Sequence, residues 1–250
     1  MIFSLTGQVA LVTGASGALG RHFARVLHGA GARVVLAARR PDSVAALAAE
    51  LGAGAMAVAL DVTDEASIAA ALEAVQAGFG APTILVNNAG IAATRPFLDH
   101  TGADWDQVMA VDLRGAFQVA QAVARAMVAA GQGGAIVNVA SILGTRVIPG
   151  VAGYSAAKAG LIQLTRQMAV ELARHRIRVN ALAPGYIATE INAEFFASDP
   201  GQALVKRIPQ RRLGQAEDLT GPLLLLASAA GAHMTGSVLT VDGGHSVNSL

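Results

Sequence analysis

The chain has 250 residues, 53% of them hydrophobic and 14% charged, with a net charge of +1 at pH 7. This composition supplies the core of one α/β domain over 1–250 and lacks the basic patch that nucleic-acid binding needs. The absence of cysteine excludes disulfides and thiolate chemistry. No apolar run is long enough to span a membrane and no signal peptide is visible, so we expect a soluble cytoplasmic protein.

Short apolar runs alternate with longer stretches of helical pattern, a rhythm typical of βαβ units around a parallel sheet. The runs are continuously apolar, as expected for strands that helices cover on both faces. The predicted strands are 8–12, 33–37, 55–60, 83–86, 134–139, 177–182 and 237–241. These strands predict a Rossmann-type, doubly wound sheet of seven parallel strands in a single domain.

Helical patterns fill the intervals between the strands. The predicted helices are 19–30, 42–51, 65–78, 104–130, 153–175 and 216–229. Asp42, Asp64 and Asp104 stand where N-terminal capping residues are expected. The segment 186–213 is too long for a simple connection, and it follows a strand end, so we expect a helical lid over the substrate. The alternative is a plain pair of surface helices.

The first predicted strand runs directly into a glycine-rich turn that precedes a helix. Glycine permits a tight turn and lets backbone N–H groups approach a pyrophosphate at the helix N-terminus. The candidate residues for binding a dinucleotide here are Gly14, Ser16, Gly17, Leu19 and Gly20. A glycine-rich loop alone is weak evidence, and its place between strand and helix makes it informative.

The end of the second predicted strand bears on the choice of cofactor. An NAD-binding fold usually has an acid there, whereas this chain has Ala38 followed by Arg39 and Arg40. The planar guanidinium matches a phosphate, so NADP(H) is expected to bind in preference to NAD(H). The alternative is a pair of solvated arginines. Asp61 and Val62 follow the third strand and are expected near the adenine, or simply at a helix cap.

Tyr154 and Lys158 are spaced to lie on one face of the helix predicted over 153–175. A nearby cation favours the phenolate, so the lysine would make the tyrosine a better proton donor. An isolated pair with this spacing is more often an ordinary feature of a helix surface. Its position thirteen residues after Ser141, in a chain with a dinucleotide turn, favours the catalytic interpretation.

With these motifs in order, the chain resembles the short-chain dehydrogenase/reductase family over essentially its whole length. The matching motifs are Thr13–Gly20, Asn87–Gly90, Ser141 with Tyr154 and Lys158, Pro184-Gly185 and Val241–Gly244. The resemblance implies that Ser141 orients a substrate carbonyl, Tyr154 supplies its proton, and Lys158 assists the tyrosine and holds the nicotinamide ribose, with no metal. It adds as cofactor contacts Asn88, Ala89, Gly90, Pro184, Gly185, Ile187 and Thr189.

Two positions depart from the family pattern. Ala18 replaces the middle glycine of the cofactor turn, a change of one methyl group. The fourth catalytic residue of the family is usually an asparagine, and here it is Asp112 in Val111–Gly115. An ionised aspartate accepts hydrogen bonds but cannot donate them. The backbone carbonyl of Asp112 could still hold a water that leads to Lys158.

These features predict an NADP-dependent carbonyl reductase or alcohol dehydrogenase. The expected substrate pocket is nearly all apolar, which favours a hydrophobic ketone, a β-keto ester or a secondary alcohol. Its expected wall residues are Ile91, Ala92, Ala93, Ile142, Leu143, Val151, Tyr186 and Ile191.

Two alternatives remain open. One is a 3-oxoacyl carrier-protein reductase, whose docking surface near the site mouth would use the basic residues between Arg174 and Arg178. The other is a non-catalytic NADP-sensing protein. We also expect a homotetramer, because charge is scarce and 153–175 carries apolar residues on more than one side, such as Leu164 and Met168.

Overall fold

A computed structural model describes residues 2–248, except for the side chain of Ile191. Its seven strands are β1 (Val9–Thr13), β2 (Arg33–Ala38), β3 (Ala55–Ala59), β4 (Ile84–Asn87), β5 (Gly134–Val139), β6 (Ile177–Pro184) and β7 (Val238–Val241). They form one parallel sheet in the order β3-β2-β1-β4-β5-β6-β7. The predicted doubly wound sheet is confirmed, and every strand end lies within two residues of its predicted position.

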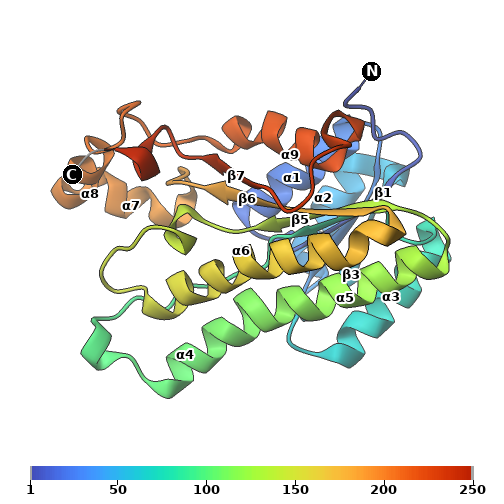
Figure 1. The fold of residues 1–250 in the computed structure, drawn as a ribbon, viewed down its shortest axis with the longest axis horizontal. Helices are drawn as coiled ribbons and strands as arrows, with labels where there is room; N and C mark the ends of the chain where they lie inside the picture. Colours follow the sequence, from blue (N-terminus) through green and yellow to red (C-terminus); the bar gives the residue numbers. More distant parts are fainter. Residues whose placement is uncertain (1, 249–250) are drawn as a thin grey trace.

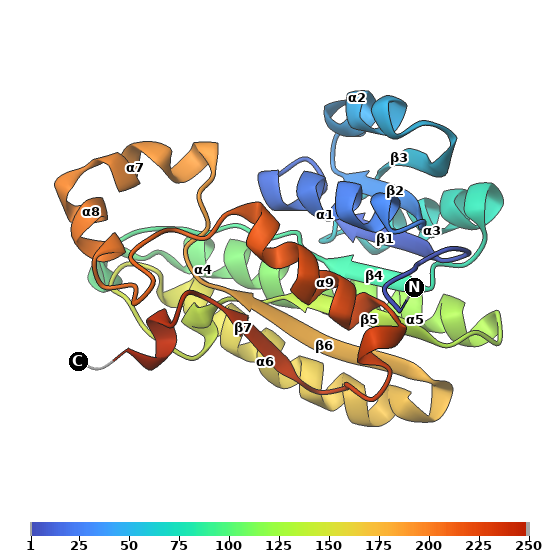
Figure 2. The same cartoon turned by 90° about the horizontal axis from the view of Figure 1, so that it is seen from above.

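Helices cover both faces of the sheet (Figures 1 and 2). One face is covered by α1 (Ala18–Gly29), α2 (Asp42–Leu51) and α9 (Thr220–Ala227), and the other by α3 (Glu65–Phe79), α5 (Ala116–Ala129) and α6 (Ala152–Leu172). Since successive strand residues point to opposite faces, Val34 and Leu36 join one core cluster while Val35 and Ala37 join the other. Apolar side chains therefore point to both faces of the strand.

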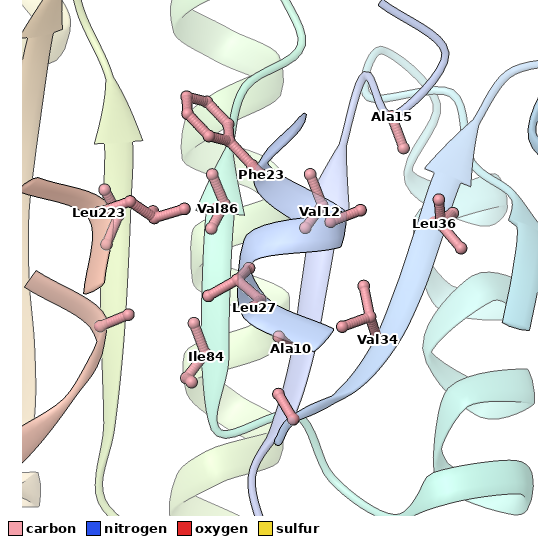
Figure 3. Packing of buried hydrophobic residues seen from close by; sticks show 14 of the residues in the cluster. Ala10, Val12, Ala15, Phe23, Leu27, Val34, Leu36, Ile84, Val86 and Leu223 are labelled. Carbon is pink, nitrogen blue, oxygen red and sulfur yellow. The ribbon is translucent and has the colours of Figure 1, made fainter. Parts of the chain in front are cut away.

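Figure 3 shows the packing on the first face, where Phe23 and Leu27 of α1 lie over β1, β2 and β4. Both side chains are fully buried, as are Val12 and Val86 beneath them. Burying a side chain of this size contributes about 1.5–3 kcal/mol. This packing holds α1, and with it the turn that precedes the helix, against the ends of β1 and β4.

The helix predicted over 104–130 is interrupted. It consists of α4 (Gly102–Met109), a π-helical turn η3 (Ala110–Gly115) and α5. Such turns occur frequently at functional sites, and this one contains Asp112, whose exposed fraction is 0%. The buried positions of the turn, Asp112 and Gly115, follow the buried Val108 at the spacing of a regular helix, which is why the sequence predicted a single helix.

Only one of the three predicted helix caps is confirmed. Asp64 caps α3 by accepting a hydrogen bond from the Ala66 N–H at 2.9 Å. Asp104 is not the cap of α4: Thr101 is, and Asp104 is its reciprocal partner in a capping box. Asp42 lies inside the first turn of α2, and no side chain caps that helix.

The segment 186–213 is helical, as predicted, and it contains η6 (Glu190–Asn192), α7 (Ala193–Ala197) and α8 (Asp199–Val205). Ser198 separates the two α-helices and caps the second one. In both views the segment lies at one end of the molecule, beside the C-terminal turn and beyond the carboxyl ends of the strands (Figures 1 and 2). Over the described residues, no helix combines the length and apolar character needed to cross a membrane.

Candidate active site

The crevice for a ligand is expected where the strand order reverses, between β1 and β4. The loops after these two strands are joined by the Asn88 side chain, which donates to the carbonyls of Thr13 at 3.0 Å and Gly14 at 3.2 Å. The Thr13 hydroxyl accepts hydrogen bonds from the N–H groups of Asn88 and Ala89. Asn88, predicted as a cofactor contact, therefore also shapes the glycine turn.

Two glycines of this turn, Gly14 and Gly20, are required by close packing. Gly14 has φ +63°, and a Cβ on it would lie 2.8 Å from the Ala89 Cα. A Cβ on Gly20 would lie 2.8 Å from the Ala15 Cα. No side chain caps α1 at Gly17, so N–H groups at its N-terminus remain available to an anion. The turn thus fits the pyrophosphate of a dinucleotide.

Arg21, in the first turns of α1, supports the glycine turn and was not predicted from the sequence. Its guanidinium donates to the Ser16 carbonyl at 3.0 Å and to the Ser43 carbonyl at 2.9 Å. It thereby ties the glycine turn to the first turn of α2, the helix that follows Arg39 and Arg40. The available signal was a basic residue directly after the last glycine of the turn.

Arg39 and Arg40 follow β2, and both side chains are exposed. Neither forms an ion pair within the part of the chain that the structure describes. Asp61 accepts hydrogen bonds from the hydroxyl and the N–H of Thr63, and these bonds, with the charge of Arg39, hold the pKa of Asp61 below its usual value. Val62 is buried against Gly115.

Ser141, Tyr154 and Lys158 line one cavity of about 370 Å³, which we name the central cavity. The Lys158 Nζ lies 3.0 Å from the Val139 carbonyl oxygen and 5.5 Å from the centre of the Tyr154 ring. Ser141 lies two residues after the end of β5, and its Oγ accepts a hydrogen bond from the Leu143 N–H. The remaining lining residues are Leu19, Asn88, Gly90, Ile91, Ala92, Val139, Ala140, Pro184, Gly185, Tyr186, Ile187, Thr189 and Asn192.

Asp112 forms a buried ion pair with Lys158, with 3.2 Å between Oδ2 and Nζ. Its other oxygen accepts a hydrogen bond of 2.8 Å from the Ile91 N–H. Burial raises the pKa of Asp112, while the charge of Lys158 and the Ile91 hydrogen bond oppose that rise. A Cβ on Gly90 would lie 2.9 Å from Oδ2, so glycine leaves room for the carboxylate.

A chain of buried polar side chains supports this site from below. Asn87 donates to Asn138 at 3.0 Å, and Asn138 donates to Thr165 at 2.8 Å. These bonds join β4, β5 and α6, the elements that carry the site residues. These hydrogen bonds were not predicted from the sequence, although two asparagines within largely apolar strands were a usable signal, since buried amides need partners.

Some predicted pocket residues lie elsewhere. Ile142 and Leu143 line a neighbouring cavity, to which Tyr186 also belongs. Val151 is buried and Ala93 is half-buried, and neither lines the central cavity. The side chain of Ile191 is outside the described residues.

The basic residues considered for a docking surface are far from this site. Arg174, His175, Arg176 and Arg178 lie around the start of β6, at the amino ends of the strands, whereas the central cavity is at the carboxyl ends. Arg178 donates to the backbone carbonyls of Ser228 and Gly231, so its guanidinium already has hydrogen-bond partners within the chain. The prediction that they lie near the mouth of this chain's site is wrong. The basic residues lie at the start of β6 and the cavity lies at its end, so the length of the strand separates them.

Comparison with known proteins agrees with this architecture. A family model described as Enoyl-(Acyl carrier protein) reductase matches residues 14–246. Gluconate 5-dehydrogenase of Gluconobacter oxydans is 40% identical and covers 99% of this chain and 98% of its own. The 3-oxoacyl-(acyl-carrier-protein) reductase of Escherichia coli is 38% identical over 95% of this chain and 97% of its own. A solved gluconate 5-dehydrogenase from Burkholderia cenocepacia, in complex with NADP and tartrate, has a TM-score of 0.95 at 39% identity, covering 99% and 98%.

The chain belongs to the short-chain dehydrogenase/reductase family. It is an oxidoreductase of the class that acts on alcohol and ketone groups with a nicotinamide cofactor.

Proposed function

We propose that the chain is an NADP(H)-dependent carbonyl reductase or alcohol dehydrogenase for a hydrophobic carbonyl compound. The convergence of Ser141, Tyr154 and Lys158 on the central cavity, beside the glycine turn, carries this proposal. A protein that only sensed NADP would need the turn but not these three side chains. The catalytic function therefore accounts for more of the site.

In the reductive direction, the Ser141 hydroxyl donates a hydrogen bond to the substrate carbonyl oxygen and orients it. Bound NADPH would supply the hydride to the carbonyl carbon. Tyr154 donates a proton to the oxygen, acting as a general acid. Lys158 places a positive charge beside the tyrosine ring and stabilises the phenolate that remains. Alcohol oxidation uses the same groups in reverse.

Asp112 acts as a positioning residue in this proposal. Its carboxylate holds the Lys158 ammonium on one side and the Ile91 N–H on the other. An asparagine of the same shape has one acceptor oxygen, because its Nδ2 can only donate, so it can accept from Lys158 or from Ile91 but not from both. Alanine would leave the lysine with the Val139 carbonyl as its partner. The carboxylate is thus needed for its acceptor geometry, and it also compensates a buried charge.

NADP(H) is the preferred cofactor in this proposal. Arg39 and Arg40 are exposed beside the end of β2, and Ala38 presents no carboxylate to repel a 2′-phosphate. One charge-assisted pair is worth about 1.5–3 kcal/mol, or roughly 10- to 150-fold in affinity. Comparing kcat/KM for NADPH and NADH on one ketone tests this, and equal values would reject it. Ala38→Asp with Arg39→Ile should reverse the preference.

A panel of carbonyl compounds tests the proposed reaction. We expect hydrophobic ketones and β-keto esters to oxidise NADPH faster than polyol-derived ketoses do, because Ile91, Ala92 and Ile187 line the central cavity. No turnover of any ketone by protein that binds NADPH would overturn the proposal. Running the panel in both directions also identifies the favoured alcohols.

A 3-oxoacyl carrier-protein reductase is the second candidate, favoured by the Escherichia coli relative. Its docking partner is acidic, but the basic residues from Arg174 to Arg178 lie at the far edge of the sheet in the same chain. A 3-oxoacyl thioester turned over much faster than a β-keto ester of equal length would favour this candidate.

The proposal includes a homotetramer and a lid. α5 and α6 present a shared groove lined by apolar side chains that include Phe117, Val128 and Met168, and the first two of these are exposed in the single chain. Covering such a groove with a second copy removes it from water. A monomer by light scattering at micromolar concentration would contradict the assembly.

The lid is 186–213, which contributes Tyr186 and Asn192 to the central cavity.

A further inference from the structure

A second cavity, of about 230 Å³, lies next to the central cavity, and we name it the side cavity. Tyr186 lines both cavities. Ile142 and Leu143, which directly follow Ser141 in the chain, also line the side cavity. A substrate whose carbonyl lies at Ser141 therefore has an adjacent space for the rest of its chain.

The side cavity has a cationic lining. Arg146, Arg207 and His245 contribute to it, and none of its described lining residues carries a carboxylate. Arg146 spends one N–H on the Ser246 carbonyl at 2.8 Å, and a guanidinium has five donors in all. Neither arginine forms an ion pair among residues 2–248.

Two polar atoms in this lining are buried and lack a hydrogen-bond partner within the described chain. They are the Tyr186 hydroxyl oxygen and the His245 Nδ1, on rings whose centres are 5.5 Å apart. Burial is the largest cause that lowers the pKa of His245, Arg146 and Arg207 lower it further, and Asp242 opposes them. An unpaired buried hydroxyl is costly, and a ligand oxygen would satisfy it.

We propose that the side cavity binds an anionic group, a carboxylate or a phosphate, at the far end of the substrate. The substrate is then an oxo acid or hydroxy acid with an apolar middle: its carbonyl lies at Ser141 and Tyr154, its chain against Ile142 and Leu143, and its anion between the two arginines. Arg207 follows α8, so the bound anion also holds the lid segment down. This inference rests on the proposed reductase function.

The test compares straight-chain oxo acids with their methyl esters, using NADPH and varying the number of methylenes between ketone and carboxylate. An oxoalkyl phosphate of matching length separates phosphate from carboxylate recognition. At the best length, kcat/KM for the anion should exceed that for the ester by about tenfold or more, the effect of one charge-assisted hydrogen bond. Arg207→Gln and Arg146→Gln should remove most of this advantage and leave the ester rate unchanged.

Arg146→Lys, which keeps the charge, should restore part of the advantage. Arg174→Gln removes the same charge at the opposite edge of the sheet and is the matched control, with no expected effect. Equal rates for acid and ester, or equal losses for both in the arginine variants, would overturn the side-cavity proposal while leaving the reductase intact. If no ketone is turned over, titration calorimetry with the saturated carboxylate decides: binding that needs Arg207 supports the anion site, and no binding refutes it.

Discussion

The candidate active site around Asp112, Tyr154 and Lys158, which we call the strand-end site, and the segment 186–213 are built in different ways. In the site, hydrogen bonds join residues far apart in the chain, as between Asp112 and Ile91 or between Lys158 and Val139. In the segment, side chains bond within a few residues, as Ser198 does with the Phe195 carbonyl. Asp112 and Lys158 are buried, whereas most of α7 and α8 is exposed.

This difference separates two requirements of an enzyme. Groups that move a proton must be held in one geometry, and partners from several elements provide that. A segment with local bonds and few buried side chains opens at lower free energy, which suits substrate entry. Among the described residues of the segment, the buried apolar side chains are Ile187, Phe196 and Ile208, and Ile187 joins the core cluster of the first sheet face.

Replacement of Tyr154 by phenylalanine should give the largest effect in the strand-end site. The ring stays and the proton donor is lost, so we expect kcat to fall by roughly 10²-fold or more. Thermal unfolding and NADPH binding, measured on the same protein, should be unchanged. Activity close to that of the parent enzyme, with normal cofactor binding, would refute the assigned role.

Gly20→Ala tests whether the glycine turn, like the strand-end site, tolerates no change in its packing. Its new Cβ would meet the Ala15 Cα at 2.8 Å, a contact that forces the backbone to shift. We expect a loss of about 1–3 kcal/mol in the free energy of unfolding and weaker NADPH binding. Gly17→Ala is the control, because the nearest atom to its Cβ is the Gly14 carbonyl oxygen at 3.5 Å. Equal stability of the two variants would contradict this account.

Two substitutions of Asp112 compare the loss of its negative charge with the loss of its acceptor oxygens. Asp112→Asn should keep kcat within about tenfold, because it restores the residue usual in the family and its amide oxygen keeps one of the two acceptor contacts. Asp112→Ala should lose more, since the buried Lys158 is left without its ion-pair partner and the Ile91 N–H without its acceptor. Rates measured beside circular dichroism spectra check this. An inactive but folded Asp112→Asn variant would show that the carboxylate itself has a role.

The smallest effect is expected at Asp218, whose ion pair with Arg212 joins the end of the segment to η7 (Ala216–Leu219). The hydrogen bond from Arg212 lowers the pKa of Asp218 to about 2. Because this value is below that of the unfolded chain, the stabilisation is complete above a pH of about 4 and is lost as the pH falls through about 2.

Asp218→Asn should therefore lower Tm by about 1–3 °C at pH 6, the small effect of an exposed pair. The difference between variant and parent should shrink as the pH falls from about 4 towards 2. A Tm difference independent of pH in this range would show that the ion pair does not contribute. Arg25–Glu50, an exposed pair on α1 and α2, offers a comparison outside the segment.

Local sequence pattern was sufficient for the sheet, most of the helices and the glycine turn. Continuous apolar runs, helical periodicity and glycines before a helix each follow from the geometry of a single element. The same patterns predicted which residues follow the ends of β1, β2, β4 and β5. They could not show the π-helical turn at Asp112, because its buried residues keep the spacing of a regular helix.

Only the tertiary structure decided which distant side chains meet. The Asp112–Lys158 pair, the Arg21 bonds to Ser16 and Ser43, and the Asn138–Thr165 bond join separate elements. The same is true of the side cavity. Arg146 precedes α6 in the sequence and Arg207 follows it, yet both side chains line this cavity. No local period encodes such contacts, since each depends on the strand order and on which face of the sheet a helix covers.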